Sequence, residues 1–235
     1  MVFVTLLIVI GIILLLSLFL FYLFYQFYFL RNPKRKIPTG NNIVSPADGR
    51  IVRIMKISAK SKNGVNTINN THITIEKGIF GMIKTSIADV GEECYLIHIM
   101  LTPLDVHFQR APIEGNIRLI NYTEGKFQNA VNDAQSLRCF ENEKNEILFI
   151  GENNLKVKVI QIAGALARRI VCFVKVGYTL KKGEHIGLIK IGSQVSLIIP
   201  SNCKLQVKEN DYVYGGSTII ANILDSKKIK NKKKK

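Results

Sequence analysis

The chain contains no tryptophan and little negative charge. Its 17 Asp and Glu residues are outnumbered by 33 Lys and Arg residues, which gives a formal net charge of +16 at pH 7. The four cysteines show no CxxC pairing and no metal-ligand spacing, so a zinc-ribbon or thioredoxin-like protein is not indicated. We expect all four to be small buried apolar side chains: Cys94, Cys139, Cys172 and Cys203.

Charge is entirely absent from residues 2–30. At a rise of about 1.5 Å per residue, such a run crosses a hydrocarbon layer about 30 Å thick, so we predict a transmembrane anchor at residues 1–30. Cations follow the apolar run instead of preceding it, which favours a retained anchor over a cleaved signal peptide: Arg31, Lys34, Arg35 and Lys36. Because such cations stay on the cytoplasmic side, we expect a single-pass protein of the cell (inner) membrane whose folded domain faces the cytoplasm.

The basic excess is concentrated partly in a tail at residues 225–235, which ends in KKIKNKKKK. The tail has too few apolar residues to pack, and we expect it to be disordered. Each lysine close to anionic headgroups gains about 1 kcal/mol, so an anionic membrane is the expected partner of the tail. Nucleic acid is not expected, because no strand pattern interleaves aromatic residues with cations.

Short apolar runs with two-residue alternation dominate residues 43–224. Two of them alternate Leu155, Val157 and Val159 with Lys156 and Lys158, and Val195 and Leu197 with Gln194 and Ser196. Turn residues separate the runs at positions 48–49, 62–64, 151–154 and 182–183. The pattern predicts a mainly β barrel or sandwich, joined to the anchor by a basic connector at residues 31–42. Only residues 129–138 are a candidate for a soluble helix.

A serine follows a glycine at Gly192 and Ser193, on a predicted tight bend between two β-type runs. Glycine has no Cβ to crowd attack on its own carbonyl, so the bend favours approach of Ser193 Oγ to the preceding peptide carbon. An ordinary glycine turn explains the pair equally well when it is considered alone. Gly216 and Ser217 form a second pair of the same kind.

Asp48 and His107 supply the other residue types that serine chemistry needs. A histidine takes the proton of the serine hydroxyl, and a carboxylate orients the histidine and stabilises its charged form. Considered singly, Asp48 is also explained as part of an Asp-Gly turn and His107 as a hydrogen-bonded structural histidine. The spacing alone does not bring these two residues to Ser193.

Five ordered segments resemble the phosphatidylserine decarboxylase family, in its small, membrane-associated form that includes archaetidylserine decarboxylase-like members. They are FLRNPKRKIP, SPADGRI, DVHFQRAPIEG, IQIAGALARRIVC and KKGEHIGLIKIGS. SPADGRI and KKGEHIGLIKIGS also resemble the turn-strand units of lipoyl-like hybrid-motif barrels. The residues around KKGEHIGLIKIGS fit the processing site of the family, which favours Ser193 over Ser217.

The resemblance implies a phospholipid-biosynthetic lyase that converts phosphatidylserine to phosphatidylethanolamine and CO2, or archaetidylserine to archaetidylethanolamine. It implies a zymogen that cleaves itself between Gly192 and Ser193. Ser193 would become a pyruvoyl group at the start of the small chain 193–235, and this covalent cofactor would form a Schiff base with the amine of the serine phospholipid. No metal is expected, and the oligomeric state stays open.

By the same resemblance, His107 carries the acid-base work and Asp48 orients it. Longer family members tend to carry a second histidine three positions after the first, and Arg110 stands there in this chain. Arg110, Arg168 and Arg169 are candidate ligands of the lipid phosphate, with plain solvation as the alternative. The rival interpretations are a non-catalytic, membrane-tethered lipoyl-like adaptor and a hybrid-barrel zinc peptidase, which the lack of an HxH pair disfavours.

Overall fold

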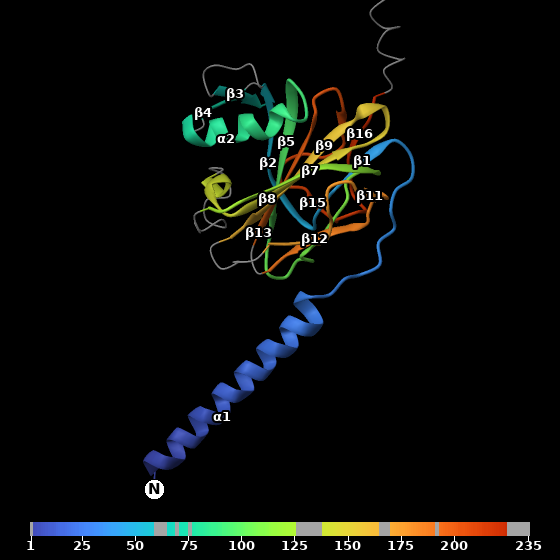
Figure 1. The fold of residues 1–235 in the computed structure, drawn as a ribbon. Helices are drawn as coiled ribbons and strands as arrows, with labels where there is room; N and C mark the ends of the chain where they lie inside the picture. Colours follow the sequence, from blue (N-terminus) through green and yellow to red (C-terminus); the bar gives the residue numbers. More distant parts are fainter. Residues whose placement is uncertain are drawn as a thin grey trace, which may run out of the picture.

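The protein is described by a computed structural model at residues 2–58, 65–68, 71–74, 77–125, 138–164, 170–190 and 193–224. These residues form one long N-terminal helix and a mainly β domain (Figure 1). The predicted fold class, a mainly β chain preceded by one apolar helix, is confirmed. The three predicted turns at residues 48–49, 151–154 and 182–183 are present, and residues 62–64 lie outside the described part of the chain.

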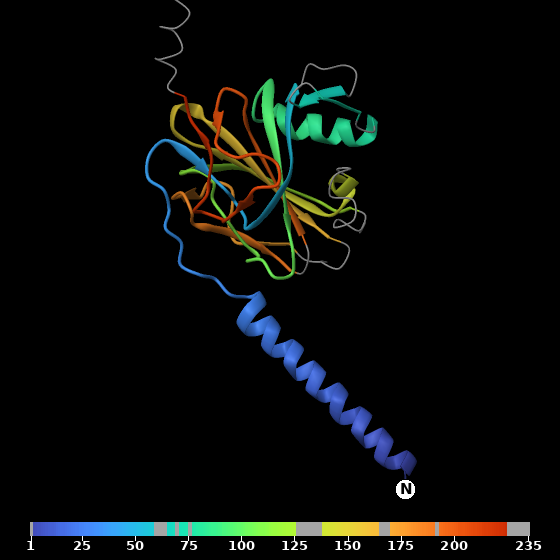
Figure 2. The same ribbon diagram turned by 180° about the vertical axis from the view of Figure 1, so that it is seen from behind.

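The N-terminal helix α1 (Val2–Leu23) continues as a π-helical turn, η1 (Phe24–Phe29). Together they make 28 residues that are long and apolar enough to cross a membrane. None of the residues of α1 is buried, and both views show the helix leaving the β domain (Figures 1 and 2). An apolar helix of this length that the described residues leave uncovered is consistent with membrane association.

Eight antiparallel strands form a curled sheet that resembles half of a barrel. Val and Ile residues at alternate positions favour these strands because their branched side chains pack well on a pleated surface. In spatial order the strands are β11 (Thr179–Leu180), β7 (Gly115–Thr123), β8 (Lys144–Ile150), β9 (Lys156–Ala163), β13 (Ser193–Pro200), β5 (Glu93–Leu101), β2 (Gly49–Ser58) and β15 (Tyr212–Val213).

Three smaller antiparallel sheets and two short 3-10 turns complete the domain. One sheet orders β1 (Asn42–Val44), β16 (Ile219–Asn222) and β14 (Lys204–Leu205). A second orders β10 (Ile170–Cys172), β12 (His185–Ile189) and β6 (Phe108–Arg110), and β3 (Val65–Ile68) pairs with β4 (Thr71–Thr74). The 3-10 turns are η2 (Arg138–Glu141) and η3 (Glu152–Asn154).

Both faces of the large sheet are covered. The inner face packs Val159, Val195 and Leu197 into the main core, as their alternation predicts. The outer face forms a second core beneath helix α2 (Lys77–Ala88), which lies against one side of the sheet in Figure 1. Sequence analysis missed α2, although Ile79, Ile83 and Ile87 repeat every four residues and bury one helix face.

The covered outer face buries a charged side chain. Lys158, which alternates with Val157 and Val159 along β9, has a side chain that is only 1% exposed and that binds Glu146 at 2.9 Å and Asp89 at 2.6 Å. The alternation correctly divides the strand into two sides, but it does not reveal that α2 covers the second side.

Two further expectations concern the cysteines and the soluble helix. Cys94, Cys139 and Cys203 are buried as predicted, but Cys172 is exposed, so the prediction was wrong at that position. Cys172 ends β10, a strand only three residues long, where a side chain is easily left uncovered. The helix candidate at residues 129–138 lies outside the described residues except for Arg138, which begins η2.

Candidate active site

The main chain is fixed on both sides of the candidate cleavage bond. At the end of β12, the Ile189 N–H donates a hydrogen bond to the His107 carbonyl at 3.3 Å. Strand β13 starts at Ser193, which pairs with Leu101 of β5 and Ala163 of β9. Lys190 lies between these fixed points, and Gly192 lies outside the described residues. The register therefore brings the backbone of Ser193 and the loop that carries His107 to the same end of the sheet.

His107 is fully buried, and only one of its ring nitrogens has a partner among the described residues. Nδ1 lies 2.9 Å from the carbonyl oxygen of Asp105. A carbonyl oxygen only accepts hydrogen bonds, so Nδ1 carries the proton and Nε2 keeps a free lone pair. Nε2 is buried without a hydrogen-bond partner in the described part of the chain. Burial lowers the pKa of His107 to about 4, so the ring is neutral at pH 7 and is ready to accept a proton.

Asp105 stabilises the loop that presents His107. Its carboxylate accepts hydrogen bonds from the Thr102 N–H at 2.6 Å and the Thr102 hydroxyl at 2.8 Å. The Tyr212 hydroxyl donates to the other carboxylate oxygen. Burial and this bond raise the pKa of Tyr212. The loop is thus closed locally and tied to β15, which fixes the carbonyl that orients His107.

Asp48 lies in the same region and is bound by other groups. Its carboxylate accepts hydrogen bonds from the Gly215 N–H at 2.7 Å and from Arg35 Nη2 at 2.6 Å. Burial raises the pKa of Asp48, while these two donors partly oppose the rise. A direct bond between Asp48 and His107 is not among the contacts of the described residues. The group that orients the imidazole here is the Asp105 carbonyl, which the motifs did not indicate.

Of the three candidate phosphate ligands, Arg110 lies among the described residues. Arg110 is 8% exposed and donates to the carbonyls of Gly183 at 3.0 Å and Pro33 at 3.2 Å, and to Asn32 Oδ1 at 2.8 Å. These bonds tie the connector to the domain. Arg168 and Arg169 lie outside the described residues.

A row of buried amide side chains reaches the His107 carbonyl, and sequence analysis missed it. Asn145 donates to Gln161 at 2.8 Å, Gln161 donates to Gln109 at 2.8 Å, and Gln109 donates to the His107 carbonyl at 2.6 Å. A Cβ at Gly187 would lie 2.5 Å from Gln161 Nε2, so a glycine is needed there. We name Asn145, Gln161 and Gln109 the amide relay. The signal in the sequence was a glutamine inside the apolar run VIQIA.

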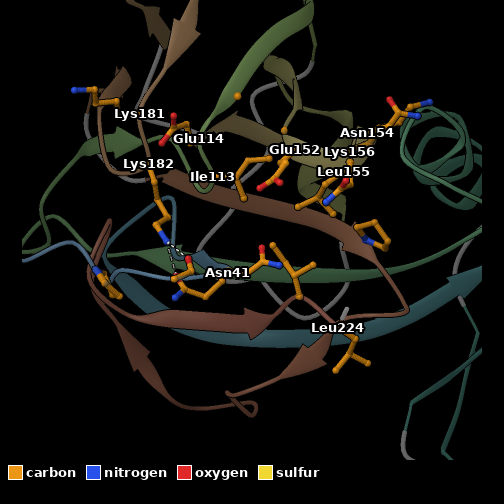
Figure 3. A pocket seen from close by; sticks show the side chains of 18 of the residues that line it. Asn41, Ile113, Glu114, Glu152, Asn154, Leu155, Lys156, Lys181, Lys182 and Leu224 are labelled. Carbon is orange, nitrogen blue, oxygen red and sulfur yellow. Dashed lines mark hydrogen bonds between the residues drawn. The ribbon is translucent and has the colours of Figure 1, made fainter. Parts of the chain in front are cut away.

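A hollow of about 1090 Å³ lies elsewhere on the domain (Figure 3). Residues 37–42 of the connector line it together with η3 and the turn at Lys182, which donates to the Gly40 carbonyl at 2.9 Å. Neither His107 nor Asp48 lines this hollow. Among the described residues, no group of three or more His, Cys, Asp or Glu side chains is arranged to hold a metal ion.

An apolar helix joined to a mainly β domain, with a buried histidine near the helix end, is the arrangement of a membrane-associated enzyme whose class the comparisons with known proteins give. Residues 22–221 match the family model described as phosphatidylserine decarboxylase. The chain therefore belongs to the phosphatidylserine decarboxylase family and is a decarboxylase of phospholipid biosynthesis.

Relatives from bacteria and an archaeon support this membership. A phosphatidylserine decarboxylase proenzyme of Wolbachia pipientis wMel is 36% identical over 197 residues, which cover 83% of this chain and 74% of the relative. One from Saccharopolyspora erythraea is 32% identical over 197 residues, with 83% and 72% covered. A Methanocaldococcus jannaschii protein, provisionally named archaetidylserine decarboxylase proenzyme, is 38% identical over 195 residues, with 83% and 87% covered.

Proposed function

We propose that this chain cleaves itself between Gly192 and Ser193 and then decarboxylates a serine phospholipid through a pyruvoyl group made from Ser193. The observation that carries the proposal is the buried, neutral His107, whose Nε2 lacks a partner among the described residues and whose carbonyl binds the chain three residues before Gly192. Such a nitrogen is the general base that a serine hydroxyl requires.

In the first step, His107 Nε2 takes the proton of the Ser193 hydroxyl while Oγ attacks the Gly192 carbonyl carbon. The peptide C–N bond breaks, and the nitrogen of Ser193 takes up the proton, so an ester links Gly192 to Ser193. Asp48 stabilises the positive charge that His107 carries during the transfer. The reaction needs no co-reactant, because the proton that leaves the hydroxyl returns to the new amine.

Elimination then divides the chain. A base removes the α-proton of Ser193, the Cβ–O bond breaks, and Gly192 leaves with a carboxylate. The dehydroalanine that remains tautomerises, and water replaces its nitrogen as ammonia, which leaves a ketone at the start of the 43-residue chain 193–235.

The described residues fit a pyruvoyl group, because the buried His107 Nε2, which has no partner among them, can exchange a proton with a substrate bound to such a group. When formed, the group supplies a carbonyl that the lipid amine attacks and a sink for the electrons released with CO2. His107 Nε2, which is neutral at rest, takes up a proton earlier in the reaction and returns it to the former α-carbon. Arg110, Arg168 and Arg169 bind the lipid phosphate; the described contacts of Arg110 use three of its five N–H donors.

The proposal also assigns the parts of the chain. Residues 1–30 anchor it in the cell membrane as a single pass, 31–42 form the connector, and 43–224 form the decarboxylase domain on the cytoplasmic side. The tail at 225–235 binds anionic headgroups. Support comes from the apolar helix and from the cations that follow it.

The test is the intact mass of the purified full chain beside Ser193→Ala and Ser217→Ala. We expect two fragments divided after Gly192 in the wild type and in Ser217→Ala, and one uncut chain in Ser193→Ala. Equal cleavage in wild type and Ser193→Ala would contradict the proposal. A single uncut wild-type chain without decarboxylase activity would instead support the adaptor alternative.

The lipid substrate is assigned by CO2 release from vesicles. Phosphatidylserine and its ether-linked archaeal counterpart are offered separately to the cleaved enzyme. Faster release from one of them identifies the substrate, and the absence of release from both would contradict a serine-phospholipid decarboxylase.

A further inference from the structure

We propose that residues 29–35, which begin at the last residue of the membrane helix, form a wall of the active site in which Phe29 positions His107 and Arg35 positions Asp48. We name this segment the juxtamembrane clasp. The inference rests on the proposed roles of His107 and Asp48, and it gives the anchor a part in catalysis in addition to attachment.

Phe29 covers the imidazole of His107. The two ring centroids lie 4.1 Å apart with the planes inclined by 32°, and Phe29 is 1% exposed. Its neighbour Phe27 is 76% exposed. Both residues lie in the π-helical turn η1 that ends the membrane helix, and π turns occur often at functional sites. The last turn of the membrane helix thus places one aromatic ring on the candidate base and leaves the other outside.

The clasp is also bonded to the segments on either side of His107. Arg31 donates to the carbonyl of Leu104, and its guanidinium lies 4.0 Å from the ring centre of Tyr28. Asn32 Oδ1 accepts hydrogen bonds from Arg110 at 2.8 Å and from His185 Nε2 at 3.0 Å. These contacts fix the position of Phe29 against the imidazole, because hydrogen bonds join the segment that carries Phe29 to the segments on either side of His107.

Arg35 provides the second contact with a candidate catalytic group. It binds Asp48 at 2.6 Å, and the two side chains are 14% and 6% exposed. Burial raises the pKa of Asp48, and the Arg35 charge and hydrogen bond act against that rise. Loss of Arg35 would therefore move the pKa of Asp48 further upward and leave more of it protonated.

Phe29 has a corresponding effect on His107. Burial is the main reason that the pKa of His107 falls to about 4, and Phe29 is part of that burial. Among the described residues, the charged groups that act most on the pKa of His107 are Asp105 of its own loop and Arg31 of the clasp, and Tyr212 donates a hydrogen bond to the Asp105 carboxylate. Removing Phe29 admits water to the ring, so the pKa of His107 should rise toward its usual value.

The first test measures the pKa of His107 directly, by NMR titration of the uncut Ser193→Ala chain in detergent micelles. Phe29→Ala is introduced into this chain as the test variant and Phe27→Ala as the control variant. The resonance of the His107 ring is assigned by its loss in a His107→Gln variant. We expect a pKa near 4 in the parent and the control, and a rise of one to two pH units in Phe29→Ala. An unchanged pKa in Phe29→Ala would overturn the proposal for Phe29.

The second test follows self-cleavage of newly made chain against pH. If the pKa of His107 rises by about two units, Phe29→Ala loses about tenfold in rate at pH 5 and little at pH 8, since only the neutral ring acts as a base. Phe29→Leu should restore most of the rate. If the cleavage rates of Phe29→Ala and Phe27→Ala fall at the same acidic pH, the proposed role of Phe29 is contradicted.

Arg35→Met is compared with Lys34→Met, whose parent side chain is exposed. We expect Arg35→Met to slow cleavage several-fold at pH 6 and to recover at pH 8, because Asp48 must be ionised, and Arg35→Lys to recover part of the loss. Equal behaviour of the two Met variants would overturn the role of Arg35. If the wild type itself stays uncut, the proposed function fails, and the NMR titration still decides the contact between Phe29 and His107.

Discussion

His98 and His107 occupy two regions of the same domain and share one property. Both are fully buried, and burial lowers the pKa of each to about 4. They differ in hydrogen bonding. His98 lies within β5 and binds Ser196 through Nδ1 at 2.6 Å and Gln194 through Nε2 at 2.9 Å. His107 has one such partner among the described residues, and its Nε2 has none there.

The difference shows that a shifted pKa alone does not mark a catalytic residue. Burial makes both rings neutral, but only a nitrogen with a free lone pair can accept the proton of a hydroxyl. The register of β5 and β13 sets His98 opposite Ser196, so strand pairing supplies its partner. His107 follows a loop closed by Asp105, and the hydrogen bond that its ring makes among the described residues is to a main-chain carbonyl.

The largest effect is expected when each histidine is replaced by glutamine. His107→Gln removes the general base and should slow self-cleavage by about 10²–10⁴-fold. His98→Gln should cost about 1–3 kcal/mol of folding free energy and leave the cleavage rate of folded chain within about tenfold. Quantifying the fragments on denaturing gels over time, beside urea unfolding, checks both. Fast cleavage in His107→Gln would reverse the assignment.

Substitutions on the outer face of the sheet should change the free energy of unfolding and not the rate of self-cleavage. Lys158→Ala leaves Glu146 without its buried partner, and we expect a loss of about 3–5 kcal/mol in the free energy of unfolding. Lys156→Ala, two positions earlier on β9 and only half-buried, is the control and should cost little. Urea denaturation of the uncut Ser193→Ala chain makes the comparison. Equal losses in both variants would mean that the buried ion pair contributes nothing.

The amide relay should affect the rate without shifting its pH dependence. Gln161→Met interrupts the row that ends at the His107 carbonyl, and a small displacement of the base should slow cleavage by about tenfold. The slowing should be the same at pH 5.5 and pH 8, because no charged group is changed. Gln206→Met, at an exposed glutamine, is the control. A shift of the acid limb in Gln161→Met would show that the relay acts through the pKa of His107 instead.

The smallest effect is the contribution of His98 to the pH dependence of stability. Its pKa is lower in the folded protein than in the unfolded chain, so the unfolded chain binds more protons between about pH 6.5 and 4. Stability is therefore full above pH 6.5 and falls as the pH drops to 4, by up to about 1.4 kcal/mol per pH unit for this histidine. Urea unfolding of Ser193→Ala with and without His98→Gln should give a shallower slope in the double variant. Parallel slopes would contradict the burial argument.

The strands could be predicted from the sequence, because the alternation of apolar and polar residues indicates which side chains share one face of a strand. It placed Val195 and Leu197 on the inner side correctly. It does not indicate that Lys158 is buried, because the cover over the outer side, α2, comes from a segment about 70 residues earlier. The repeat of Ile79, Ile83 and Ile87 was the available signal for that cover.

The site could be predicted only in part, for a related reason. Motifs named Asp48, His107 and Ser193, and the register brings the backbone of Ser193 and the loop that carries His107 to the same end of the sheet. The partners of these residues are a carbonyl at Asp105 and a guanidinium at Arg35. A backbone carbonyl has no sequence signature, and a contact between a membrane helix and a loop 78 residues later depends on tertiary packing.

The most direct test is to trap the lipid on the enzyme. The purified full chain is incubated with phosphatidylserine vesicles, treated with a mild borohydride reductant, and measured by intact mass. We predict that the 43-residue fragment beginning at position 193 gains the mass of the bound lipid and lacks a free amino terminus. A single 235-residue polypeptide, or a lipid attached only to another part of the chain, would contradict the account.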